Sequence, residues 1–153
     1  RDQLTLEFAG VYRHYHAAFM RTLMIGKPGR QHVAMEQACR EALAAVEAVL
    51  VPGRTAGEVF DAHAEVMDAH GMRPHRLNAC GYSMSAKFTP SWMDVPMFYR
   101  GNPTVLAPRM VFFVHMILAN SDAGAAYTLG RSYIIGPRRP EPLSAEPLDM
   151  IIR

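Results

Sequence analysis

The sequence lacks the features that mark exported, disulfide-stabilised and membrane-embedded proteins. Its only cysteines, Cys39 and Cys80, are far apart and form no Cys-x-x-Cys pair. Two such cysteines make no disulfide framework, and this favours a reducing compartment. No apolar run approaches the ~20 residues that a membrane helix needs, and no signal-peptide pattern is present. We therefore expect a cytoplasmic protein with no membrane contact.

Charge of one sign is also scarce. The 16 Lys and Arg residues nearly balance the 14 Asp and Glu residues, which leaves a formal net charge of +2. The densest basic cluster, "GPRRPEP" at 136–142, has only two arginines. A nucleic-acid-binding surface needs a larger basic patch, so we expect no nucleic acid partner. A chain of 153 residues that is half hydrophobic and one fifth charged is typical of one globular domain.

The first half of the chain contains a strand-like segment and then two helical ones. Residues 4–26 alternate apolar and polar side chains, which predicts a β-hairpin. Within it, His14 and His16 are two positions apart, so in a strand they would share one face. Residues 30–51 have apolar side chains at helical spacing, and the helix is expected to end at Pro52-Gly53.

A capping signal marks the start of the second helix. Thr55 is a good N-cap residue, and Glu58 three positions later completes a capping box. Gly71 is suited to the position that follows the helix. We therefore predict a helix between Thr55 and Gly71, with an apolar side that includes Val59, Phe60 and Met67.

The second half reads as an irregular segment followed by strands. Residues 80–108 are rich in Gly, Pro, Ser and aromatic residues and show no helical period. Residues 110–118 and 127–136 are strand-like, and a short last strand is expected within 140–153. Strands at both ends with two helices between them predict an α+β fold.

His115 lies near the centre of the most apolar strand-like run. The residues alone leave two interpretations open: a core histidine with one hydrogen-bond partner, or a residue of a functional site. A histidine that is only part of a core needs no further explanation, so other parts of the sequence must decide.

Several motifs, in this order, resemble the C-terminal catalytic domain of the pita-bread (M24-type) family. These are "GVYRHYHAAFMRTLMIGKP" (10–28), "VLVPGRTAGEVFDAHAEVMDAHG" (49–71), "GNPTVLAPRMVFFVHMI" (101–117), "LGRSYIIG" (129–136) and "EPLS" (141–144). The family includes methionine aminopeptidase, prolidase, creatinase and ectoine hydrolase. The resemblance implies an antiparallel sheet covered by helices. Together with a first residue other than Met, it leads us to expect that residues 1–153 are the C-terminal portion of one pita-bread catalytic domain, incomplete at its N-terminus.

The resemblance also shows which family residues have been replaced. Peptidases of this family hold two metal ions with two Asp, one His and two Glu. Those five positions fall here on Glu7, Ala18, Tyr82, His115 and Gly130. Two adjacent divalent ions need bridging carboxylates, and one carboxylate does not suffice. Creatinase and ectoine hydrolase work without metal, and their "RYHA…RT" and "GYS" motifs are closer to this sequence. The resemblance therefore implies a metal-independent protein without a cofactor.

This branch of the family implies hydrolysis of a non-peptide C–N bond in a small amidine or cyclic amidine. We expect Glu7, His115 and Tyr82 to be catalytic. The candidates for general base are His115, His14 and His16, and the Glu7 carboxylate could hold the cation, orient water or attack directly. The expected substrate-binding residues are His14, His16, Ser83, Trp92 and Asp94. Arg21 and Thr22, and the histidines at 32, 63, 70 and 75, are expected to be structural or on the surface.

Three alternatives remain open. A pita-bread domain without its ligands could be a non-catalytic binding module. An Xaa-Pro-type aminopeptidase is the second alternative, and a mononuclear metal site of His14, His16 and His115 is the third, for which no fourth ligand is apparent. We also expect a homodimer, because an incomplete pita bread exposes one sheet face and the apolar side of its second helix.

Overall fold

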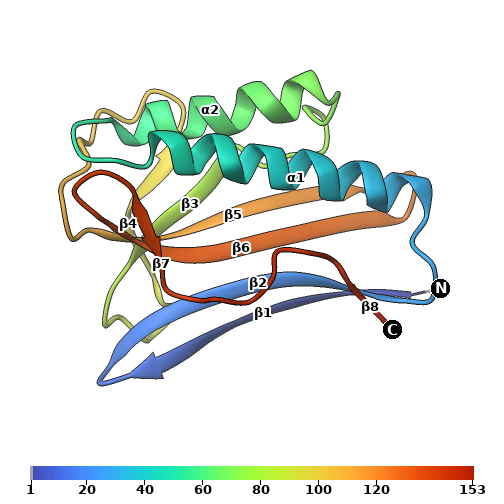
Figure 1. Cartoon of the computed structure of the whole chain (residues 1–153), viewed down its shortest axis with the longest axis horizontal. Helices are drawn as coiled ribbons and strands as arrows, with labels where there is room; N and C mark the ends of the chain where they lie inside the picture. The colour runs from blue at the N-terminus through green and yellow to red at the C-terminus, as the bar shows by residue number, and fades with distance from the viewer. Residues whose placement is uncertain (1) are drawn as a thin grey trace.

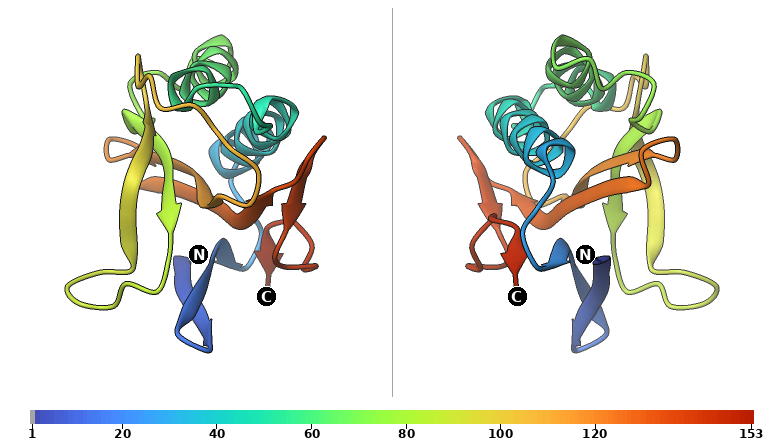
Figure 2. Two further views of the ribbon diagram at one scale, coloured as in Figure 1. Left: turned by 90° about the vertical axis from the view of Figure 1, so that its left-hand side faces the viewer. Right: turned by 90° about the vertical axis from the view of Figure 1, so that its right-hand side faces the viewer.

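The computed structural model describes residues 2–153 and has an α+β architecture (Figure 1). Its elements are β1 (Asp2–Tyr12), β2 (Tyr15–Ile25), α1 (Arg30–Val49), α2 (Ala56–Ala69), β3 (Ala79–Met84), β4 (Met93–Tyr99), β5 (Val111–Asn120), β6 (Ala125–Ile135), β7 (Pro140–Pro142) and β8 (Ile151–Ile152). The sheet order is β1-β2-β6-β5-β3-β4, and all these neighbours are antiparallel. Both helices lie on one side of the curved sheet (Figure 2). The α+β prediction is confirmed. Within residues 2–153, no helix has the length and apolarity to cross a membrane.

The helices begin and end where local signals predict. The Thr55 Oγ1 atom accepts a hydrogen bond from the Glu58 amide at 3.2 Å, and the Glu58 carboxylate accepts one from the Thr55 amide at 2.6 Å. This reciprocal pair is the capping box expected from the sequence. Gly71 has a φ of +71°, a conformation that glycine adopts without strain just after a helix.

The turn of the first hairpin contains His14, which therefore does not lie in a strand. Pairing of β1 with β2 extends from Asp2 opposite Ile25 to Tyr12 opposite Tyr15. Only Arg13 and His14 are left to form the turn, and both have positive φ, as tight two-residue hairpin turns require. The prediction that His14 and His16 share one strand face is therefore wrong.

Residues 80–108 are not irregular throughout, because they contain β3 and β4. Register shifts between these strands, from Ala79 to Ser83, break the alternation by which a strand is recognised in a sequence. Pro96 lies in β4 without disrupting the sheet, because β4 is an edge strand and needs no outward N–H donor. Local composition hid both strands.

The sheet separates two clusters of buried side chains. The larger cluster lies between the helices and the sheet, and it includes Phe60, Phe112 and Val114. The smaller cluster lies on the opposite face and consists of Ala18, Met20, Tyr82, Met84 and Phe113. Because side chains alternate along β5, His115 follows Phe113 onto this second face.

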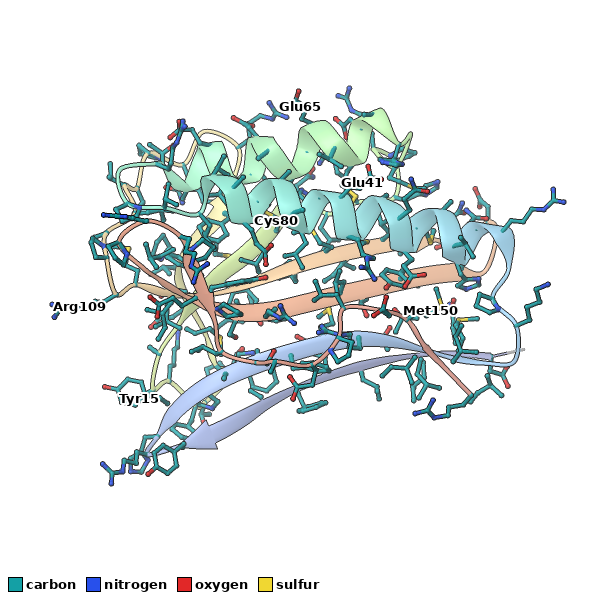
Figure 3. All side chains as sticks on the ribbon, in the orientation of Figure 1. Tyr15, Glu41, Glu65, Cys80, Arg109 and Met150 are labelled. Carbon is teal, nitrogen blue, oxygen red and sulfur yellow. The ribbon has the colours of Figure 1, made fainter. Side chains whose placement is uncertain are left out.

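The apolar side of α2 is buried, so the prediction that it is exposed is wrong. Val59 and Met67 have no exposed surface, because α2 packs against α1 and β4. Exposed apolar side chains occur instead on the hairpin, where Phe8 is 55% and Tyr15 68% exposed. Tyr15 lies near the free end of this hairpin (Figure 3).

Candidate active site

Strand register brings the five positions of the family's ligands to one face of the sheet. Glu7 pairs with Met20, Met20 with Gly130, and Gly130 with His115, which makes one row across four strands. Directly paired residues project to the same face. Ala18 and Tyr82 belong to the buried cluster on that face. The positions brought together on the face away from the helices are Glu7, Ala18, Tyr82, His115 and Gly130.

His115 is held in an aromatic and largely dry environment. Its side chain is 6% exposed, and its ring centroid lies 5.7 Å from that of Tyr82 and 5.8 Å from that of Phe113. Burial lowers the pKa of His115 to about 4. The imidazole is therefore neutral at pH 7. Its buried Nδ1 atom has no hydrogen-bond partner within residues 2–153.

Tyr82 connects His115 to an aromatic wall. The Trp92 Nε1–H donates a hydrogen bond to the Tyr82 hydroxyl oxygen at 3.0 Å. The His16 ring lies 6.2 Å from Trp92 and 4.6 Å from Phe88. This wall therefore combines side chains from β2, from β3 and from the loop that follows β3. Because the Tyr82 oxygen accepts from Trp92, its own hydrogen stays available for another partner.

Glu7 faces Tyr82 across the same surface. Partial burial raises the pKa of Glu7. Burial, and to a smaller degree the charge of Glu7, raise the pKa of Tyr82, so the two groups are within electrostatic reach. Glu7 and His115 are three strands apart in the sheet order, but the sheet is curved (Figure 2), and Tyr82 on the next strand beyond His115 is still within electrostatic reach of Glu7. Because the rings of Tyr82 and His115 lie 5.7 Å apart, Glu7 and His115 face the same space.

Of the expected substrate-binding residues, Ser83 lies outside this surface and Asp94 has local partners, while the His14 ring lies at its edge, 6.2 Å from Phe88. Ser83 pairs with Phe112 and so faces the helix side, where its hydroxyl donates to the Val111 carbonyl at 3.5 Å. Asp94 accepts hydrogen bonds from Ser85 and from its neighbour's amide, which lower its pKa. His14 lies exposed in the hairpin turn. Strand alternation explains why Ser83 is separated from Tyr82.

Phe88 and Phe113 line the site, although the sequence analysis did not single them out. Phe113 has the same parity as His115 in the strand-like run 110–118, and this signal could have identified it. No comparable signal marks Phe88, because it lies in the loop between β3 and β4. Its position beside His16 depends on tertiary structure alone.

Comparison with known proteins shows what the chain is similar to. Residues 1–136 match the sequence pattern of metallopeptidase family M24. The chain belongs to family M24. It is 33% identical over 107 residues to the ectoine hydrolase of Halomonas elongata, an alignment that covers 69% of this chain and 27% of that protein. It is 28% identical over 149 residues to the uncharacterized hydrolase/peptidase y4tM of Sinorhizobium fredii, covering 97% of this chain and 37% of that protein.

Solved structures of pita-bread M24 proteins show the same fold. The X-Pro aminopeptidase of Thermotoga maritima superposes with a TM-score of 0.91 at 16% identity, over 99% of this chain and 42% of that one. Dipeptidase PepE of Mycobacterium ulcerans gives a TM-score of 0.90 at 18% identity, over 99% and 40%. The chain thus spans 27% to 37% of the curated relatives above and about two fifths of these structures.

The residues present do not fit the two-metal centre of M24 peptidases. Glu7 is the one carboxylate among the five ligand positions. Within residues 2–153, no group of three or more His, Cys, Asp or Glu side chains is placed to hold a metal ion, the histidine set considered above included. At position 130 the space for a side chain is already taken. A Cβ atom there would overlap Phe113 Cζ and lie 2.7 Å from Phe113 Cε2 and 2.9 Å from Met20 Cβ.

This close packing makes Gly130→Ala a test of the site's geometry. We expect the substitution to lower the free energy of unfolding by about 1–3 kcal/mol, because the added methyl group must displace the Phe113 ring. Urea denaturation measures this change. Gly10→Ala is the matched control, since a Cβ atom at Gly10 meets nothing within 4 Å. Equal stability of Gly130→Ala and Gly10→Ala would contradict the packing described.

Arg21 and Thr22 support the site from within the sheet, as expected. Arg21 is 1% exposed, and its guanidinium donates to the carbonyl oxygens of Met20 and Gly130 at 2.8 Å each. The Thr22 hydroxyl accepts from the Thr128 amide at 2.7 Å. The bonds from Arg21 to Gly130 and from Thr128 to Thr22 join β2 to β6. They lie next to the two positions at which these strands pair, Phe19 with Arg131 and Met20 with Gly130.

Proposed function

We propose that the protein hydrolyses a C–N bond of a small cationic amidine or cyclic amidine without a metal ion. The observation that carries the proposal is a neutral, buried His115 beside Tyr82, on the same sheet face as the carboxylate of Glu7. The identity with an ectoine hydrolase over 69% of the chain supports the substrate class. Membership of family M24 supports a hydrolytic reaction in general.

Each residue of the surface has a role that its environment favours. Glu7 holds the positive charge of the amidinium, and the aromatic rings of Trp92 and Phe88 add favourable contact with a cation. Tyr82 donates its free hydroxyl hydrogen to the substrate. His115 accepts a proton from the water that attacks the amidine carbon, and the same proton then goes to the departing nitrogen as the C–N bond breaks.

The replacement of four of the five ligand positions favours a second candidate function. The Glu7 carboxylate and the aromatic wall can hold a cationic ligand without any reaction. A non-catalytic binding module is therefore the alternative. The Xaa-Pro-type aminopeptidase receives no support from the donor set, because its two metal ions would have one carboxylate among five positions.

Substrate turnover in the presence of a chelator distinguishes these functions. We expect the purified protein that contains this chain to hydrolyse ectoine or creatine at the same rate with and without EDTA. Proton NMR of the reaction mixture measures this rate. Elemental analysis after incubation with Mn²⁺, Co²⁺ and Zn²⁺ should find less than one ion per chain. Two bound ions with EDTA-sensitive turnover would overturn the metal-free mechanism. Saturable binding without products would show the binding module instead.

The expected homodimer stays a prediction, and the exposed hairpin is the surface that motivates it. One face of β1, which is an edge strand, carries three apolar side chains that are each more than half exposed: Leu4, Phe8 and Tyr12. Apolar patches of this kind usually mark interfaces. Analytical ultracentrifugation is expected to give twice the monomer mass, and a monomer at micromolar concentration would contradict it.

A further inference from the structure

A cavity rich in arginine lies outside the candidate active site. It has a volume of about 590 Å³ and is lined by Phe60, Asp68, Arg73, Arg76, Asn78 and Arg100. Its residues come from α2, from the segment between α2 and β3, and from the residue after β4 (Figure 1). Because both helices lie on the sheet face opposite His115, this cavity and the candidate active site are separate.

Arg76 is a fixed wall of the cavity. Its Nε and Nη2 atoms donate to the two carboxylate oxygens of Asp68 at 2.7 and 3.2 Å, and its Nη1 donates to the Leu77 carbonyl. The Arg76 side chain is only 7% exposed. Both Asp68 oxygens are thus engaged by one guanidinium, in the bidentate arrangement that suits this pair.

The other two arginines are weakly compensated. Arg73 has no hydrogen bond or ion pair within residues 2–153. Arg100 reaches Asp61 at 3.4 Å, but both side chains are more than half exposed, so this pair contributes little. The guanidinium groups of Arg73, Arg76 and Arg100 all lie close enough to Asp68 to affect it. The hydrogen bond from Arg76 first, and then the charges of Arg73 and Arg100, lower the pKa of Asp68.

The cavity therefore concentrates positive charge without enough acid to balance it. Asp68 is the only carboxylate in the lining, and Asp61 beside it pairs with Arg100, so the charge of Arg73 is left without an acidic partner within residues 2–153. Arg76 and Arg100 also both lie near the Phe60 ring, at 5.5 and 5.8 Å from its centroid. Two cations held on one ring repel each other, and an anion between them would relieve this repulsion.

We propose that this cavity binds a doubly charged phosphate group, either inorganic phosphate or a phosphate monoester. Guanidinium groups match the spacing of phosphate oxygens, and the Asn78 amide adds uncharged donors. A dianion would neutralise the charge of Arg73 and compete with the exposed Asp61 carboxylate for Arg100. The cavity volume also leaves room for an organic group attached to the phosphate. The proposal is independent of the function assigned to the opposite face.

Isothermal titration calorimetry at pH 7.5 and constant ionic strength tests the site with three probes: inorganic phosphate, glycerol 3-phosphate and succinate. We expect one phosphate per chain, and glycerol 3-phosphate should bind at least as tightly if the site recognises monoesters. Tighter binding of inorganic phosphate than of glycerol 3-phosphate identifies free phosphate as the ligand. Succinate carries the same charge on planar groups and should bind at least about tenfold more weakly, a difference of about 1.4 kcal/mol.

Arg73→Gln and Arg100→Gln are the test variants, because both side chains are exposed and their loss leaves the core intact. Each should weaken phosphate binding about tenfold, as expected for losing a hydrogen bond to a charged group. Arg138→Gln, an exposed arginine outside the cavity, is the matched control and should bind as the wild type does. Absence of saturable phosphate binding, succinate binding of equal strength, or the same loss in Arg138→Gln would each overturn the proposal.

Discussion

Replacement of His115 by glutamine is expected to lower kcat/KM for amidine hydrolysis by about 10²- to 10⁴-fold, the usual contribution of a general base. Glutamine is polar and similar in size, but it cannot accept and return a proton at neutral pH. His115 is the one buried histidine beside Tyr82 on the proposed substrate face. Steady-state kinetics on the protein that contains this chain measures the effect.

The pH dependence of the wild type gives an independent measurement of the same role. Because burial lowers the pKa of His115 to about 4, the base stays neutral and active well below pH 6. The acid limb of kcat/KM should therefore not lie near 6.5. On lowering the pH it should first reflect protonation of Glu7, whose pKa burial raises, and then protonation of His115 near 4. His75→Gln, which changes a half-buried histidine outside the site, is the control for kinetics. Unchanged turnover in His115→Gln would exclude His115 as the general base.

A loss of stability between pH 6.5 and pH 5 is the second large effect that we expect. Burial lowers the pKa values of both His63 and His115 from 6.5 to about 4. In this window the unfolded chain binds protons at these histidines and the folded chain does not, so the free energy of unfolding rises with pH. The stabilisation is complete above pH 6.5 and declines as the pH falls toward 4.

The size of this loss follows from the same pKa values. The fall from 6.5 to about 4 corresponds to about 3 kcal/mol for each histidine at the acid end, and about 2 kcal/mol is already lost at pH 5. Urea denaturation at pH 7 and pH 5 should therefore differ by roughly 4 kcal/mol. Ordinary carboxylates titrate mainly below this window.

Two single variants assign the loss to its residues. His63→Gln and His115→Gln should each remove about half of the difference between pH 7 and pH 5, even if each lowers stability at pH 7. His14→Gln, at an exposed turn position, should leave the difference unchanged. A wild type with equal stability at both pH values would show that these histidines are not buried as described.

Local features of the fold were predictable because short-range physics produces them. The capping box of Thr55 and Glu58 involves residues three apart, and it forms wherever a helix begins there. Two strand-like runs of residues, 110–118 and 127–136, likewise predicted β5 and β6. β3 and β4 were missed because their register shifts and edge position depend on a partner strand that no local window contains.

The candidate site divides in the same way. The sequence by itself determined that the five ligand positions carry one carboxylate, because this depends only on which residues occupy them. Only the tertiary structure decided that Glu7 lies three strands from His115, that Phe113 fills the space beside Gly130, and that Ser83 faces away. Register and alternation set these relations, and a shift of one residue in pairing would reverse every face. The arginine cavity likewise depends on the packing of α2 against β4. Phe60 and Arg100, which are 40 positions apart in the sequence, line the same cavity only in the folded chain.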